Sequence, residues 1–295
     1  MFINGLISFF IFFCASDIVL KESPTALDDS MKKNKRKALG QHFLIERNIL
    51  KKIVNVIDPQ PEDLIIEIGA GKGALTFPLA KKGSRVIAIE RDSSLVPYLR
   101  KQFFPNLITL ESDVLQVNFK DLVQKKRAKI VGNLPYAISS PLLFKVLRDK
   151  DLFSACIFLL QKEVAQRLCA HPGTKKYAPI SILFQNYFVT CLHFHVPSSS
   201  FYPVPQVESA LVSLKRRVQP CFSISNQERF HTFLKGAFRS RRKKLKNNLK
   251  NLHFLEFDIR ETLKICRIDE GLRPEQVSLS QFVALFEALH PDNVL

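Results

Sequence analysis

Between residues 64 and 161 the chain alternates short apolar segments with longer amphipathic ones. Five apolar segments are rich in Val, Ile and Leu, as buried strands are: residues 64–69, 85–90, 106–115, 128–133 and 155–161. The stretches between them, such as residues 70–83 and 92–104, have the composition of helices. Strands that alternate with helices predict a parallel sheet covered on both faces. The sequence therefore predicts an α/β fold with a doubly wound, Rossmann-like sheet.

Each of the first four strands ends in a glycine or a polar residue: Gly69, Glu90, Asp113 and Asn133. The strands recur at intervals of about one βα unit. In an open parallel sheet the carboxyl ends of the strands form the edge where ligands bind. We therefore expect these four residues to line one continuous site.

The first three of these residues suit a nucleoside. EIGAGKGALT (67–76) places Gly69 and Gly71 in a turn where backbone can approach a ligand, but its spacing differs from the dinucleotide fingerprint. Glu90 is placed to accept hydrogen bonds from ribose hydroxyls, unless it only begins a helix. Asp113 could accept from an adenine amino group or cap a helix. A nucleoside pocket without a phosphate loop favours S-adenosylmethionine.

The fourth strand runs into the tetrapeptide NLPY (133–136). The Asn133 side-chain oxygen and the Leu134 carbonyl can accept both hydrogens of an exocyclic amine, and Pro135 stiffens the loop that carries them. Tyr136 can stack on an adenine that has left its helix. Without the upstream site, a proline turn with a packed tyrosine would explain the same letters. With it, the tetrapeptide predicts a binding site for a flipped-out adenine.

The chain resembles the ribosomal RNA adenine dimethylase family, most closely its KsgA type, over residues 36–290. The resemblance depends on motifs in this order: GQHFL (40–44), EIGAGKGALT (67–76), IERD (89–92), SDVL (112–115), VGNLPY (131–136), LQKEVAQRL (160–168), FYPVPQVESALVSL (201–214), FRSRRKKLKNNL (238–249) and GLRPEQVS (271–278). It implies dimethylation of two adjacent adenosines near the 3′ end of small-subunit ribosomal RNA, and a role in small-subunit biogenesis.

The resemblance also implies a set of site residues. The implied S-adenosylmethionine contacts are His42, Leu44, Gly69, Glu90, Asp113 and Asn133. His42 stands where many members of the family have Asn, and both side chains can hydrogen-bond to the cofactor. Phe201 is implied as an aromatic wall for the adenine opposite Tyr136, although from its residue type alone it would be assigned to the core.

The charge of the chain favours a polyanionic partner. Lys and Arg number 44 against 27 Asp and Glu, which gives a net charge of +17. Two segments concentrate the positive charge, and the second has a helical pattern with an apolar stripe from Phe238 to Leu252. We expect both to contact RNA phosphates through Lys32, Lys33, Lys35, Arg36, Arg239, Arg241, Arg242, Lys243, Lys244 and Lys246.

Composition divides the chain into three parts. Residues 1–30 consist of an apolar run, which no basic residue precedes, followed by an acidic linker. We interpret them as an extension upstream of the true start at Met31. The alternative is a membrane anchor or targeting segment. Residues 31–220 form the catalytic domain with its basic arm. Residues 221–295 lose the strand pattern and predict a small helical domain that binds RNA.

The sequence also indicates the compartment and the partners of the protein, and it leaves other functions open. Six cysteines without zinc spacing predict a reduced, cytoplasmic chain with no metal site. We expect a monomer with no stable membrane association, acting on the immature small ribosomal subunit. The alternatives are a dimethylase of large-subunit ribosomal RNA, a DNA adenine methyltransferase, and a ribosome-assembly factor that acts mainly by binding.

Overall fold

The computed structural model describes residues 41–123, 126–252 and 256–289. The expectations for residues 1–30, for the start at Met31 and for Lys32, Lys33, Lys35 and Arg36 lie outside these residues. Contacts group residues 40–295 into one unit. The boundary expected near residue 220 stays a prediction.

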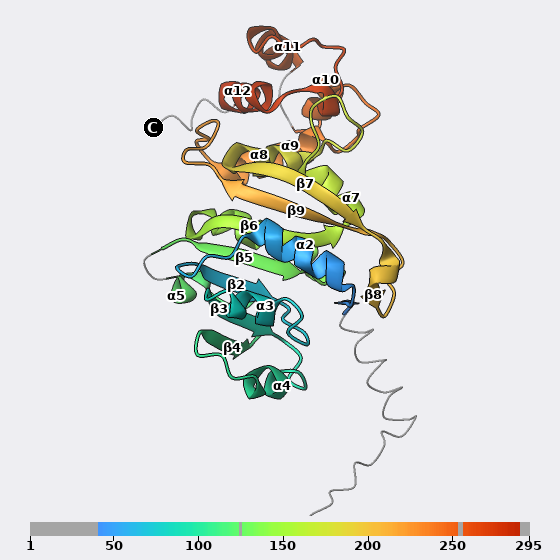
Figure 1. The fold of residues 1–295 in the computed structure, drawn as a ribbon. Helices are drawn as coiled ribbons and strands as arrows, with labels where there is room; N and C mark the ends of the chain where they lie inside the picture. Colours follow the sequence, from blue (N-terminus) through green and yellow to red (C-terminus); the bar gives the residue numbers. More distant parts are fainter. Residues whose placement is uncertain (1–40, 124–125, 253–255, 290–295) are drawn as a thin grey trace, which may run out of the picture. The chain divides into compact units, whose positions relative to one another are not determined.

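The centre of the fold is a seven-stranded sheet (Figure 1). Its order is β4-β3-β2-β5-β6-β9-β7, where neighbouring strands are hydrogen-bonded. The strands from β4 to β6 are parallel, and β9 is antiparallel to both β6 and β7. The bounds are β2 Leu64–Ile68, β3 Arg85–Glu90, β4 Leu107–Glu111, β5 Ala128–Asn133, β6 Phe153–Gln161, β7 Phe188–Val196 and β9 Ser209–Arg216. This confirms the predicted α/β class.

The chain changes direction in the sheet between β2 and β5. From β2 it proceeds outward through β3 to β4, then returns to the other side of β2 to form β5 and β6. Such a reversal opens a crevice at the carboxyl ends of the two neighbouring strands. Ile68 pairs with Gly132 there, so Gly69 and Asn133 leave the sheet side by side.

Helices cover both faces of the sheet because side chains alternate along each strand. Ile65, Val131 and Ile157 pack with α2 (Arg47–Ile57) and α3 (Thr76–Lys81). Ile66 and Ile130 belong to the opposite face, which packs against three helices: α6 (Ser139–Arg148), α7 (Lys162–Leu168) and α8 (Pro179–Tyr187). Two short helices follow the outer strands of this half: α4 (Val96–Lys101) lies between β3 and β4, and α5 (Phe119–Leu122) lies between β4 and β5.

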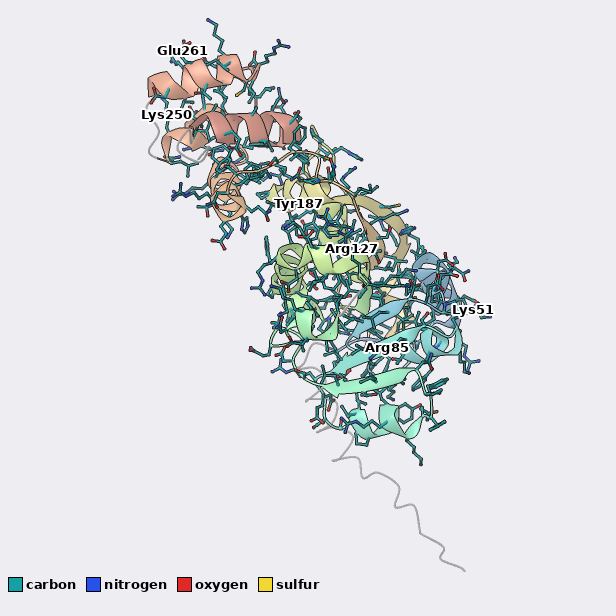
Figure 2. All side chains as sticks on the ribbon, turned by 90° about the vertical axis from the view of Figure 1, so that its left-hand side faces the viewer. Lys51, Arg85, Arg127, Tyr187, Lys250 and Glu261 are labelled. Carbon is teal, nitrogen blue, oxygen red and sulfur yellow. The ribbon has the colours of Figure 1, made fainter. Side chains whose placement is uncertain are left out.

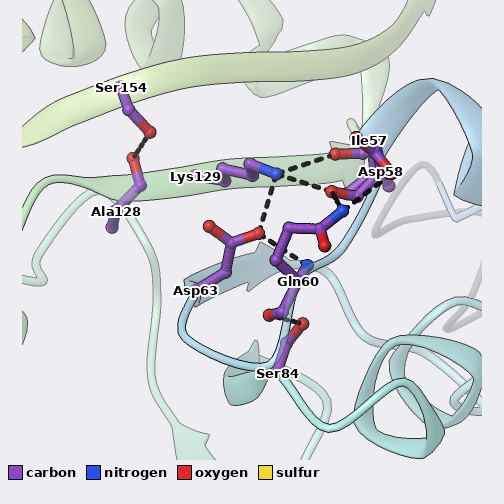
Figure 3. Close-up of polar contacts among 8 residues, drawn as sticks. All are labelled: Ile57, Asp58, Gln60, Asp63, Ser84, Ala128, Lys129 and Ser154. Atoms are coloured by element: carbon purple, nitrogen blue, oxygen red, sulfur yellow. Dashed lines mark hydrogen bonds and ion pairs between the residues drawn. The ribbon is translucent and has the colours of Figure 1, made fainter.

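Lys129, at the start of β5, ties the sheet to the end of α2 (Figure 3). Its Nζ donates to the carbonyl oxygens of Ile57 (3.1 Å) and Asp58 (2.7 Å) and lies 2.7 Å from Asp63 Oδ2. The last carbonyls of a helix lack partners inside the helix, so this cation satisfies two of them. The contacts lie at the amino end of β5, away from the strand end that carries Asn133.

A separate two-stranded ladder forms from segments far apart in the sequence. β1 (Phe43–Leu44) pairs antiparallel with β8 (Phe201–Tyr202). This ladder joins the GQHFL motif to the FYPVP motif.

The chain after Pro220 folds into helices, as predicted: α9 (Gln227–Ala237), α10 (Leu245–Lys250), α11 (Glu256–Ile265) and α12 (Leu279–Leu289). Phe230, Phe282 and Phe286 form their core, which continues into α8 through Ile182 and Leu183. Within the described part of the chain, no helix is long and apolar enough to cross a membrane.

The helical pattern predicted over residues 238–251 is only partly correct. A helix forms from Leu245, but residues 239–244 form turns in which Lys243 N donates to Ser240 O (3.1 Å). Asn248 Nδ2 donates to the carbonyls of Ala237 (2.8 Å) and Ser240 (3.0 Å). The Ala237 contact takes up a carbonyl at the end of α9, so the basic residues lie on a turn between two helices.

Candidate active site

A cavity of about 250 Å³ opens where the sheet reverses direction between β2 and β5. Its wall combines the ends of β2 and β5, the β1 ladder and the glycine turn. The residues that line it include Phe43, Leu44, Glu67, Gly69, Gly71, Asn133 and Leu159. Four of the predicted cofactor residues therefore share one cavity: Leu44, Gly69, Gly71 and Asn133.

The glycine turn brings backbone close to β1. Gly71 has φ +57°, and a Cβ built there would lie 2.9 Å from Phe43 Cε1, so a larger residue would clash as well as be strained. Gly71 N donates to Glu90 Oε2 (2.7 Å), and Asp92 N donates to Glu90 Oε1 (2.8 Å). The turn thus fixes the carboxylate of Glu90, whose two oxygens keep further acceptor capacity.

Asp113 lies in a turn just beyond β4. Its Oδ1 accepts from Leu115 N (3.0 Å), and its Oδ2 lies 3.3 Å from Arg91 Nη1. Asp113 therefore caps a turn and is not the helix cap that the sequence offered as an alternative, because the next helix, α5, begins at Phe119 with Asn118 as its N-cap. A carboxylate accepts more than these contacts supply, so a ligand contact is compatible with the same geometry.

Asn133 is oriented by a contact with the GQHFL segment. Its Nδ2 donates to the carbonyl oxygen of His42 (2.7 Å), which turns its side-chain oxygen the other way. Leu134 N donates to Leu159 O (3.1 Å), and Pro135 O accepts from Ile138 N and Ser139 Oγ (both 3.1 Å). The loop is held at several points, so the side-chain oxygen of Asn133 and the carbonyl of Leu134 are fixed relative to one another. We call these two atoms the acceptor pair.

The rings of Tyr136 and His42 lie beside the acceptor pair. Their centroids are 5.5 Å apart, with 34° between the planes. Tyr136 Oη hydrogen-bonds to Ser209 Oγ (2.8 Å), and burial raises the pKa of the Tyr136 hydroxyl. His42 Nδ1 donates to Pro203 O (2.7 Å), because a carbonyl can only accept. His42 therefore joins Asn133, Tyr136 and the loop after β8.

Phe201 lies in the core of this structure. It is 1% exposed and packs in the cluster that contains Leu44 and Leu211, whereas the next residue, Tyr202, is 55% exposed. The role of Phe201 as an aromatic wall stays a prediction.

Glu67 is a site residue that the sequence analysis missed. It lines the cavity, is 2% exposed, and its Oε2 has no hydrogen-bond partner among the described residues. Burial raises the pKa of this carboxyl to about 8. A carboxyl group inside the otherwise apolar strand LIIEI was the signal that could have identified it.

A family model described as ribosomal RNA adenine dimethylase matches residues 32–290, which is most of the chain. The chain belongs to this family.

Curated relatives and solved structures agree with this membership of the adenine dimethylase family. The chain is 42% identical over 261 residues to the ribosomal RNA small subunit methyltransferase A of Geobacter metallireducens, covering 86% of this chain and 95% of the relative. The protein of the same name from Mycoplasma capricolum is 38% identical, covering 88% and 98%. A dimethyladenosine transferase from Plasmodium falciparum superimposes with a TM-score of 0.71 at 26% identity, covering 85% of this chain and 98% of that one.

In this family member, some residues of the second basic segment are exposed and others make contacts within the fold. Arg239, Arg242, Lys243 and Lys244 are exposed. Arg241 Nη2 donates to Tyr177 O (3.2 Å), and Lys246 Nζ lies 2.7 Å from Glu270 Oε2. Structural contacts thus engage two of the six residues in this segment that we predicted to bind RNA, and the other four present their side chains to solvent.

Proposed function

We propose that this adenine dimethylase transfers methyl groups from S-adenosylmethionine to N6 of two adjacent adenosines near the 3′ end of small-subunit ribosomal RNA. It would dimethylate each and so act in small-subunit biogenesis. The observation that carries the proposal is the orientation of Asn133 by the His42 carbonyl at the edge of the cavity. The names of the curated relatives support the small subunit as substrate.

The residues around the cavity fit S-adenosylmethionine. Gly69 and Gly71 line the cavity, and Glu90 and Asp113 retain acceptor capacity for ribose and adenine. The buried, unpartnered Glu67 Oε2 adds a polar group to a mainly apolar cavity wall. The sulfonium supplies an activated methyl group, so the protein contributes mainly position.

The acceptor pair acts on the substrate amine. The lone pair of an adenine amino group is delocalised into the ring, so N6 is a poor nucleophile. In the first transfer, hydrogen bonds from both N6 hydrogens to the acceptor pair would localise that lone pair as the N–C bond forms, the sulfur–methyl bond breaks and N6 loses one hydrogen as a proton to water. In the second transfer, the remaining N6 hydrogen would keep one of these bonds. Tyr136 would hold the flipped base by stacking, with its hydroxyl held by Ser209.

The basic residues provide the RNA contact. Arg239, Arg242, Lys243 and Lys244 are exposed on one turn and match the spaced negative charge of an RNA backbone. The five described cysteines are free, which supports a reducing compartment, and we propose a cytoplasmic monomer.

The test of this proposal is the full-length Asn133→Ala variant, with Asn55→Ala as the matched control because Asn55 is exposed on α2. We expect Asn133→Ala to lose methylation of immature small subunits by a factor of about 100 or more, as when one preorganised polar contact is removed from a transition state. It should retain RNA affinity, and Asn55→Ala should match the wild type. Unchanged turnover in Asn133→Ala would refute the role of the acceptor pair.

The exposed basic turn also supports a second candidate, a ribosome-assembly factor that acts mainly by binding. Assembly in cells that carry only Asn133→Ala separates the two roles. Normal assembly without methylation would show that binding suffices.

A further inference from the structure

A second cavity, of about 630 Å³, lies between α6 and α9. This volume is in the range of ligand sites. Tyr187, labelled in Figure 2, marks the place where the helices around the sheet meet the C-terminal helices. The residues that line the cavity include Leu115, Phe144, Lys145, Arg148, Tyr187 and His231.

The wall of this cavity suits a flat aromatic ligand. Phe144 and His231 contact one another in this wall, with ring centroids 4.7 Å apart and planes 31° apart. Burial, with a smaller effect from Lys235, lowers the pKa of His231, which favours the uncharged form of its ring. Leu183 and Phe230 add apolar surface. Neutral aromatic and apolar side chains are the partners on which unstacked nucleobases stack.

Two basic side chains lie at the cavity, and one of them is exposed at its rim. Lys145 and Arg148 project from α6, and Glu228 is the acid among the lining residues. Lys145 Nζ is occupied by the carbonyl of Leu115 (3.2 Å). Arg148 Nε lies 3.5 Å from Asp149 Oδ1, but the side chain is 72% exposed, so the rest of its guanidinium can reach a phosphate at the rim.

The cavity is connected both to the proposed cofactor site and to the basic turn. On one side, Lys145 binds Leu115 O, and Leu115 N binds Asp113 Oδ1, so a single turn joins this cavity to the cofactor site. On the other side, α9 lines the cavity with its first half and ends at the basic turn 239–244. At 1.5 Å per residue α9 spans about 16 Å, the length of a few nucleotides.

We propose that this cavity receives an unstacked base of single-stranded ribosomal RNA, with an adjacent phosphate held by Arg148. The base would stack on the Phe144 and His231 pair while a different nucleotide occupies the acceptor pair. The proposal rests on RNA being the substrate, as proposed above. Binding of this base would determine which nucleotides of the RNA reach the catalytic cavity.

The first experiment measures steady-state methylation of immature small subunits by full-length His231→Ala and Arg148→Glu. The matched controls are His195→Ala and Arg85→Glu, since both residues are exposed on strands and belong to neither cavity. We expect KM for the subunit to rise about fivefold or more in each cavity variant, with kcat and the S-adenosylmethionine Kd unchanged. His231→Phe keeps an aromatic ring and should restore the KM of His231→Ala.

KM values equal to those of the controls would overturn the proposal and leave the methyltransferase function intact. The melting temperature of His231→Ala shows whether the variant is destabilised. If it is, Arg148→Glu provides the test, because Arg148 is exposed.

The second experiment uses the His231→Cys variant, whose new cysteine is labelled with a photoreactive benzophenone. The labelled protein is bound to immature small subunits and irradiated. The chain's own cysteines are first replaced by serine. A crosslink to ribosomal RNA supports the proposal, whether or not methylation occurs. A crosslink to a ribosomal protein alone, or none while the complex forms, overturns it.

Discussion

Glu67 is a residue whose chemistry depends strongly on its surroundings. Its carboxyl is buried in the cofactor cavity, and burial raises its pKa to about 8. In the unfolded chain an ordinary Glu loses its proton near pH 4.5. Between these values the folded state keeps a proton that the unfolded state has lost, so this group lowers the stability of the fold as pH rises from about 4.5 to 8.

The Glu67→Gln variant should remove this pH dependence. As pH rises from about 4.5 to 8, we expect the free energy of unfolding of the variant to increase by a few kcal/mol relative to that of the wild type. One unit of pKa corresponds to about 1.4 kcal/mol. Urea unfolding at pH 5, 6.5 and 8 provides the measurement. A difference between the two proteins that stays constant over these pH values would mean that Glu67 is already ionised at pH 5.

At the same scale, the sequence could indicate the residue types of the site but not their orientation. NLPY identified Asn133, yet the contact that orients its amide comes from His42, which lies 91 residues earlier. The hydrogen bond from His42 to the carbonyl of Pro203 likewise joins residues that are 161 positions apart. No local pattern records such pairings, because they arise when β1 and β8 pair.

At the scale of elements, Lys129 is expected to matter for stability and not for catalysis. Replacing it with Met keeps the length of the side chain and leaves the carbonyls of Ile57 and Asp58, and the carboxylate of Asp63, without their cation. We expect Lys129→Met to reduce the free energy of unfolding by about 1–3 kcal/mol. The S-adenosylmethionine Kd should not change, because Lys129 is at the amino end of β5; a weaker Kd with unchanged stability would contradict this role.

The elements themselves were predictable where burial alone decides them. β3 and β5 have the predicted bounds, because each is an apolar run inside a parallel sheet. β4 ends at Glu111, before the predicted residue 115, since the side chain of Asp113 takes the amide of Leu115 and starts a turn. The basic segment 238–251 failed as one helix because Asn248 caps the end of α9 instead.

At the scale of the whole molecule, the excess of positive charge should govern RNA affinity. The double variant Arg242→Glu and Lys243→Glu reverses two exposed charges on the basic turn. We expect weaker subunit binding at 0.1 M salt and a plot of log K against log salt that is shallower by about 1–2, because each phosphate contact contributes roughly 0.7–0.9. Binding measured over a salt series checks this, with Arg85→Glu as the control, and an unchanged slope would place the RNA elsewhere.

The central claim is tested most directly by the product. The full-length protein is incubated with S-adenosylmethionine and immature small subunits, and the modified nucleosides are mapped by mass spectrometry. The proposed function predicts N6,N6-dimethyladenosine at two adjacent positions near the 3′ end of the small-subunit ribosomal RNA. Modification of large-subunit ribosomal RNA alone would contradict the substrate, and no dimethyladenosine in either RNA would contradict the enzymatic role.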